Sequence, residues 1–144
     1  MQRLSILASS LAAAVINAAC MAPPKALDLA LTRASDAGTY VVTLVPPVPA
    51  AAINRLHAWQ IHLSTPDGLP VSHARIDVDG GMPQHGHGLP TQPQVTREPA
   101  PGAYVVEGVK FSMTGWWEIK LAIDGPAGAD RVTFHTVVDP AVGR

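Results

Sequence analysis

Cysteine is nearly absent from this chain: among 144 residues there is one, Cys20. A domain without a second cysteine forms no internal disulfide. It also has no thiolate in its body, which excludes a blue-copper electron-transfer site with its cysteine ligand. The hydrophobic core alone must therefore stabilise the fold, and the roughly 120 residues that follow an export signal are enough for one such domain.

Charge and enzyme signatures are scarce as well. Ten Lys and Arg face eleven Asp and Glu, which gives a net charge of -1 without a basic patch, so nucleic acid is not an expected partner. The sequence has no nucleophile elbow, no phosphate-cradling glycine loop and no paired carboxylates in a cleft-like context. We therefore expect a protein that is not an enzyme.

Long apolar runs are missing, and the longest one, Leu4–Ile16, is short for a membrane-spanning helix. With one positive charge before it and small residues after it, this run predicts a secretory signal peptide over residues 1–22. The placement of Cys20 after two alanines resembles a bacterial lipobox, although Asn17 stands where leucine is usual. Two outcomes stay open: a lipid anchor at Cys20, or ordinary cleavage nearby that gives a soluble periplasmic protein. Both predict a periplasmic or envelope-associated location, with membrane contact only through that anchor.

Short alternating segments fill the rest of the chain. Residues 23–38 are interpreted as a tether with a short edge strand, and residues 39–144 as a single domain. A period of two with turn signals between the segments predicts about seven strands and an all-β, immunoglobulin-like sandwich. Gly108 interrupts one strand, where we expect a bulge. The predicted strands cover residues 39–45, 56–64, 71–78, 91–96, 103–111, 116–124 and 130–138.

The Pro66-Asp67-Gly68 turn suggests that segments 56–64 and 71–78 form a hairpin. In that register His57 lies roughly opposite Val78. The hairpin would bring His57 to the end of the sheet from which the next loop leaves.

That loop, Gly80–Thr91, is too rich in glycine and proline for a helix or an inner strand. It carries Met82, His85 and His87, and thioether and imidazole together are typical copper ligands, with sulfur favouring Cu(I). Zinc rarely takes methionine. The alternative is a rigid loop whose histidines bond to the backbone and whose methionine covers the core.

Two further residues join the candidate metal ligands. Met113 lies alone in a turn, where it either binds metal or covers one end of the core. His57 is an optional ligand or a strand-end histidine bonded to a carbonyl. The remaining three histidines are expected to be ordinary surface residues: His62, His73 and His135.

Between about Arg55 and Asp124 the chain resembles the YtkA-like and FixH-like periplasmic domains. The specific parts of the resemblance are Gly81-Met82-Pro83-x-His85-Gly86-His87-Gly88 and Phe111-x-Met113-x-Gly115-x-Trp117. The resemblance implies a small secreted or membrane-attached sandwich, associated with copper handling and cytochrome oxidase maturation. It implies Met82, His85, His87 and Met113 as metal ligands.

Two functions follow as hypotheses. The first is a periplasmic copper chaperone or buffer that exchanges Cu(I) with an envelope protein. The second is a non-metal binding or assembly module that presents the Gly/Pro-rich loop to a protein partner.

Overall fold

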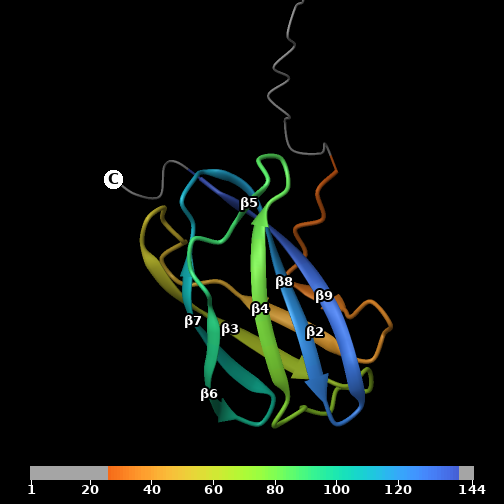
Figure 1. Ribbon diagram of the computed structural model, residues 1–144. Helices are drawn as coiled ribbons and strands as arrows, with labels where there is room; N and C mark the ends of the chain where they lie inside the picture. The colour runs from red at the N-terminus through yellow and green to blue at the C-terminus, as the bar shows by residue number, and fades with distance from the viewer. Residues whose placement is uncertain (1–25, 140–144) are drawn as a thin grey trace, which may run out of the picture.

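Strands supply the regular structure of residues 26–139, which the computed structural model describes (Figure 1). This confirms the all-β prediction for the described part of the chain; the signal peptide and Cys20 lie outside it. Seven strands have five residues or more, and β1 and β5 are shorter. The strands are β1 (Thr32–Ala34), β2 (Val41–Val45), β3 (Leu56–Ser64), β4 (Arg75–Met82), β5 (His87–Gly88), β6 (Gln94–Ala100), β7 (Ala103–Lys110), β8 (Gly115–Gly125) and β9 (Gly128–Val138).

Alternation along the strands gives the two layers a shared apolar interior. Three alternate residues of β3 and four of β8 are buried and point inward: Trp59, Ile61 and Leu63, and Trp117, Ile119, Leu121 and Ile123. Three aromatic rings meet in the core, where Phe111 lies edge-on to both Trp59 and Trp117 at centroid distances of 6.2 and 5.2 Å. Such contacts add to the stability that area burial alone provides.

The strands follow the order β1-β2-β3-β7-β6-β4-β8-β9, with β5 paired to β4. The first and last strands of this order then approach each other. Arg33 Nη1 donates to the Thr133 carbonyl at 2.8 Å, and the Asp36 amide donates to the Arg131 carbonyl at 2.8 Å. The sheet therefore curls into a nearly closed sandwich, consistent with an immunoglobulin-like fold.

The bulge expected at Gly108 is confirmed. His57 pairs with Val109 and Trp59 with Val106, so β7 carries one residue more than β3 over this stretch. Gly108 has a φ of 88°, which residues with a side chain rarely adopt. The sheet also extends N-terminal of residue 39, because β1 pairs with β2 inside the segment interpreted as a tether.

The predicted hairpin between the segments 56–64 and 71–78 is wrong. β3 pairs with β2 and β7, whereas β4 pairs with β5, β6 and β8, and only the bridge between Ser64 and Pro70 joins the connection. Residues 65–74 thus cross from one layer to the other. Alternation shows which face of a strand is buried but not which strand it pairs with, so a crossing connection reads like a hairpin.

The antiparallel pairing gives the sandwich two ends. We call one the hairpin end: it holds the start of β1, the β2–β3 loop, the β4–β5 turn, the β7–β8 turn and the end of β9. The opposite end, here the turn end, holds the β1–β2, β3–β4, β6–β7 and β8–β9 connections. His57, at the start of β3, therefore lies at the hairpin end as expected, but in the opposite layer from β4. Within residues 26–139 there is no helix long and apolar enough to cross a membrane.

Candidate functional site

The Gly/Pro-rich segment is a tight hairpin, and part of it is strand. Gly80–Met82 belong to β4, which corrects the expectation that glycine here excludes an inner strand. Gly81 pairs with Glu118 on one side and with Gly88 on the other. A Cβ on Gly80 would collide with the Glu118 carbonyl, and one on Gly81 with the His87 carbonyl. Glycine is therefore required because neighbouring backbones approach so closely.

The turn of this hairpin exposes two imidazoles. The amides of His85 and Gly86 both donate to the Met82 carbonyl, at 3.1 and 3.0 Å, and Gly86 has a φ of 65°. His85 and His87 are both exposed, with their ring planes 12° apart and their centroids 6.1 Å apart. A groove of about 250 Å³ lies beside His87, with Asp79, Glu118 and Lys120 in its walls.

Met82 points the other way. Its side chain is 1% exposed and belongs to the core cluster. Its methyl carbon lies 3.2 Å from the position that a Cβ would take on Gly115. The structure thus places Met82 beneath the hairpin, as the alternative interpretation of a methionine covering the core described.

Met113, in contrast, is 40% exposed. It lies in the β7–β8 turn, and its carbonyl accepts a 3.0 Å bond from Trp117 Nε1. Because β8 starts beside the end of β4, this turn and the histidine hairpin share one end of the molecule. Trp117, whose ring holds the Met113 turn, ends the second specific motif of the sequence, but this role was not predicted for it. Only its place four residues after Met113 could have indicated this role.

His57 is half-buried, and the backbone already occupies one of its ring nitrogens. Nε2 lies 2.9 Å from the Ala52 carbonyl oxygen and 3.1 Å from the Ala52 amide nitrogen. It therefore stabilises the β2–β3 loop, which is the alternative role considered for it.

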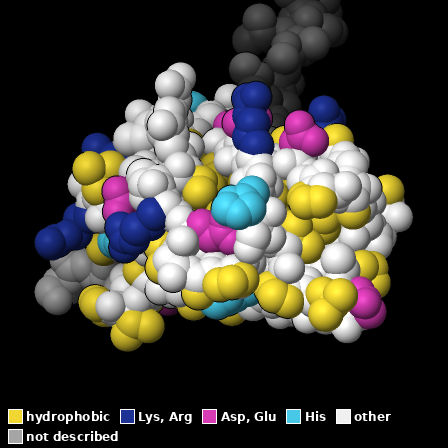
Figure 2. Space-filling view, turned by 90° about the horizontal axis from the view of Figure 1, so that it is seen from below, with side chains coloured by type: hydrophobic (Ala, Val, Ile, Leu, Met, Phe, Trp, Pro, Cys, Tyr) yellow, Lys and Arg dark blue, Asp and Glu magenta, His cyan; other side chains and the backbone are white. Residues whose placement is uncertain are grey.

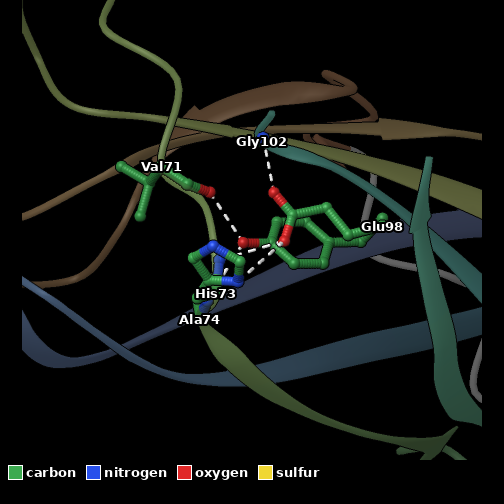
Figure 3. Close-up of polar contacts among 6 residues, drawn as sticks. Val71, His73, Ala74, Glu98 and Gly102 are labelled. Carbon is green, nitrogen blue, oxygen red and sulfur yellow. Dashed lines mark hydrogen bonds and ion pairs between the residues drawn. The ribbon is translucent and has the colours of Figure 1, made fainter. Parts of the chain in front are cut away.

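The other histidines lie away from the hairpin tip. His62 is exposed in β3, and His135 accepts a 3.2 Å bond from Trp116 Nε1 at its Nδ1. His73 lies at the turn end with a φ of 59° and a side chain that is 94% exposed. Figure 3 shows its backbone amide bonded to Glu98, at 3.0 Å. The pKa of Glu98 lies below its usual value, and this hydrogen bond is the largest cause of the shift.

The exposed donors that remain are the imidazoles of His85 and His87 and the thioether of Met113, all at the hairpin end. Among residues 26–139, no three His, Cys, Asp or Glu side chains come together to hold a metal ion. A metal bound here would therefore need a mixed donor set of His85, His87 and Met113, which suits a soft ion.

A known family matches most of the folded domain. The family model described as YtkA-like covers residues 34–122, from the end of β1 through most of β8. The chain belongs to the YtkA-like family. The match includes both specific motifs, so this YtkA-like domain contains the histidine hairpin and the Met113 turn within its shared region. Searches of curated proteins and of solved structures gave no significant match.

Proposed function

We propose that this YtkA-like protein is an exported copper handler that binds Cu(I) at the hairpin end. The observation that carries the proposal is the exposed His85–His87 pair. Two metal–nitrogen bonds of about 2 Å, with about 1 Å more from each nitrogen to its ring centre, span about 6 Å. The two rings are stacked with their centroids 6.1 Å apart, and each nitrogen lone pair lies in its ring plane, so both side chains must rotate before two nitrogens face one ion at a similar separation of the rings.

Met113 supplies the third donor in this proposal. A thioether adds affinity for Cu(I) over Cu(II) and over zinc. Met82 is buried beneath the hairpin, and His57 holds the β2–β3 loop in the opposite layer through Ala52, so neither is a donor in this proposal. Exposed ligands at a turn can be replaced one at a time by those of an acceptor protein, as transfer requires.

The test is anaerobic titration of the exported chain with Cu(I) against a chromophoric chelator. We expect stoichiometric binding that the His85→Ala, His87→Ala double variant loses and that Met113→Leu weakens by about tenfold, the loss of one ligand. His62→Ala, an exposed histidine elsewhere in the domain, is the matched control and should bind as the wild type does. Equal affinity of the double variant and the control would reject this site and favour the protein-recognition hypothesis.

A further inference from the structure

Exposed aliphatic side chains gather at one end of the molecule. Eight large hydrophobic residues are exposed within residues 26–139, and seven of them lie at or toward the hairpin end. Leu69 alone lies at the turn end. The seven are Leu29, Leu31, Val48, Ile53, Leu56, Met113 and Val137.

Four of these residues form what we call the apolar rim: Val48, Ile53, Leu56 and Met113. Val48 is 98% and Leu56 68% exposed, the two highest values among them. The loop and the turn that carry the rim are tied together, because the Asn54 amide donates to the Phe111 carbonyl at 2.7 Å. This bond holds Ile53 and Leu56 close to the turn that carries Met113.

The charged residues within 41–56 and 108–117, which carry the rim, are basic, and the carboxylates next along the chain are Glu107 and Glu118. Exposed Arg55 precedes Leu56, and Lys110 pairs with Leu56 across β3 and β7. Neither residues 41–56 nor residues 108–117 include an Asp or a Glu. Aliphatic side chains beside positive charges suit an anionic lipid surface. Protein hot spots are instead rich in Trp and Tyr, and the rim has neither.

The chain also leaves the domain at this end. In Figure 1 the described chain begins at the same end as the β4–β5 hairpin, as the direction of β1 requires. Cys20 stands six residues before Ala26, so a lipid there could lie at most about 20 Å from Ala26, at 3.3–3.6 Å per residue. An anchor of that length would hold the rim toward the bilayer.

We propose that the apolar rim docks on the surface of an anionic bilayer, so that the histidine hairpin faces the membrane. The rim side chains enter the boundary between headgroups and acyl chains, while Arg55 and Lys110 contact anionic headgroups. Any partner in metal exchange would then be a membrane-embedded protein. Docking itself rests on the rim and the chain exit and needs no bound metal.

The test uses the exported chain carrying Cys20→Ser, so that no lipid on that residue contributes. Binding is measured by co-sedimentation with vesicles of phosphatidylglycerol and phosphatidylethanolamine, and with vesicles of phosphatidylcholine alone. We expect binding to the anionic vesicles, and we expect the Val48→Asp, Leu56→Asp double variant to bind about tenfold more weakly or worse. Leu69→Asp is the matched control, since Leu69 is 61% exposed at the opposite end, and it should bind like the parent chain.

Two results would overturn the proposal. One is equal binding of the double variant and Leu69→Asp, with folding of both verified by circular dichroism. The other is binding to envelope vesicles that contain protein together with no binding to the lipid vesicles, which would make the partner a protein. Cu(I) titration of the double variant separates the two proposals, because its copper affinity should equal that of the parent chain.

Discussion

Different interactions stabilise the turn end and the hairpin end of the sandwich. At the turn end, polar side chains fix the connections: the Asp130 carboxylate accepts from the Ser35 hydroxyl at 2.6 Å and from the amides of Ala37, Thr39 and Arg131. The Ser35 bond in particular lowers the pKa of Asp130 far below its usual value. At the hairpin end, single neutral side-chain bonds, such as that of Trp117 Nε1 to the Met113 carbonyl, join close backbone contact and core packing, and His85, His87 and Met113 are exposed.

In the copper proposal, this difference assigns stability to the turn end and ligand exchange to the hairpin end. Figure 2 shows the turn end from below, where charged side chains of both signs surround a histidine. Among its carboxylates, those of Asp130 and Glu98 accept from backbone amides, and that of Asp77 pairs with Arg75 at 3.0 Å. The hairpin end leaves imidazole and thioether donors uncommitted at its surface, above a rigid aromatic core.

Replacing Met82 should change stability more than any of the other substitutions proposed. A small change would contradict the view that core packing stabilises the hairpin end. Met82→Ala leaves a cavity under the hairpin and should cost about 2–5 kcal/mol of unfolding free energy, measured by urea titration. Met82→Leu keeps the volume and should cost less than about 1.5 kcal/mol. Because the thioether is buried, the Leu variant should keep its Cu(I) affinity. A loss of affinity in a stable Met82→Leu protein would show that the core sulfur is a ligand.

Removing one hydroxyl at each end should give unequal losses. Tyr104 Oη donates to the Val71 carbonyl at 2.7 Å and accepts from the Ala74 amide at 3.1 Å, and burial raises its pKa. Tyr104→Phe leaves both backbone groups unpaired and should cost about 1–3 kcal/mol. Thr91→Val removes one half-buried bond, to the Gly108 carbonyl, and should cost at most about 1 kcal/mol. Equal losses of stability in the two variants, measured by thermal unfolding, would contradict the proposed difference between the two ends.

A smaller, pH-dependent loss is expected for Asp130→Asn, because the amide oxygen still accepts some of the same bonds. Folding lowers the pKa of this carboxyl below its ordinary value of 3.8, so its contribution is complete above that pH and declines as the pH falls. The wild type should therefore be more stable than the variant at pH 7, and the two should converge below pH 3.8. The measurement is the urea midpoint of both proteins across this pH range. A stability difference that does not change with pH would refute the prediction.

The smallest effect should follow His73→Gly. A φ of 59° strains a residue with a Cβ, by roughly 1 kcal/mol, and glycine relieves that strain while it loses more backbone entropy. The two terms nearly cancel, so stability should change by less than about 1 kcal/mol. Cu(I) affinity should not change, since His73 lies at the turn end. A large loss of stability would mean that the imidazole itself fixes the turn.

The sequence predicts single strands well and their partners poorly. The bounds of β3 agree with the predicted 56–64 segment, and the bulge at Gly108 follows from the one glycine inside a predicted strand. The prediction that β3 pairs with β4 was wrong. Each strand has an apolar inner face in whichever layer it lies, so its pattern does not identify its partner. In the candidate site, the exposed hairpin histidines were predictable from their Gly/Pro context. The burial of Met82 was not, because a thioether suits a core and a metal equally well.

The contact between the first and last strands has a consequence for how the chain folds. Arg33 and Thr133 are separated by 100 residues, so the sandwich closes only when both ends of the domain are present. Contacts of such long sequence separation slow folding because the intervening chain must be ordered before they form. The fold is therefore complete only when β9 has formed, and until then the edge of β1 that faces away from β2 stays open. Closure of the sandwich is therefore expected to be a late step in folding.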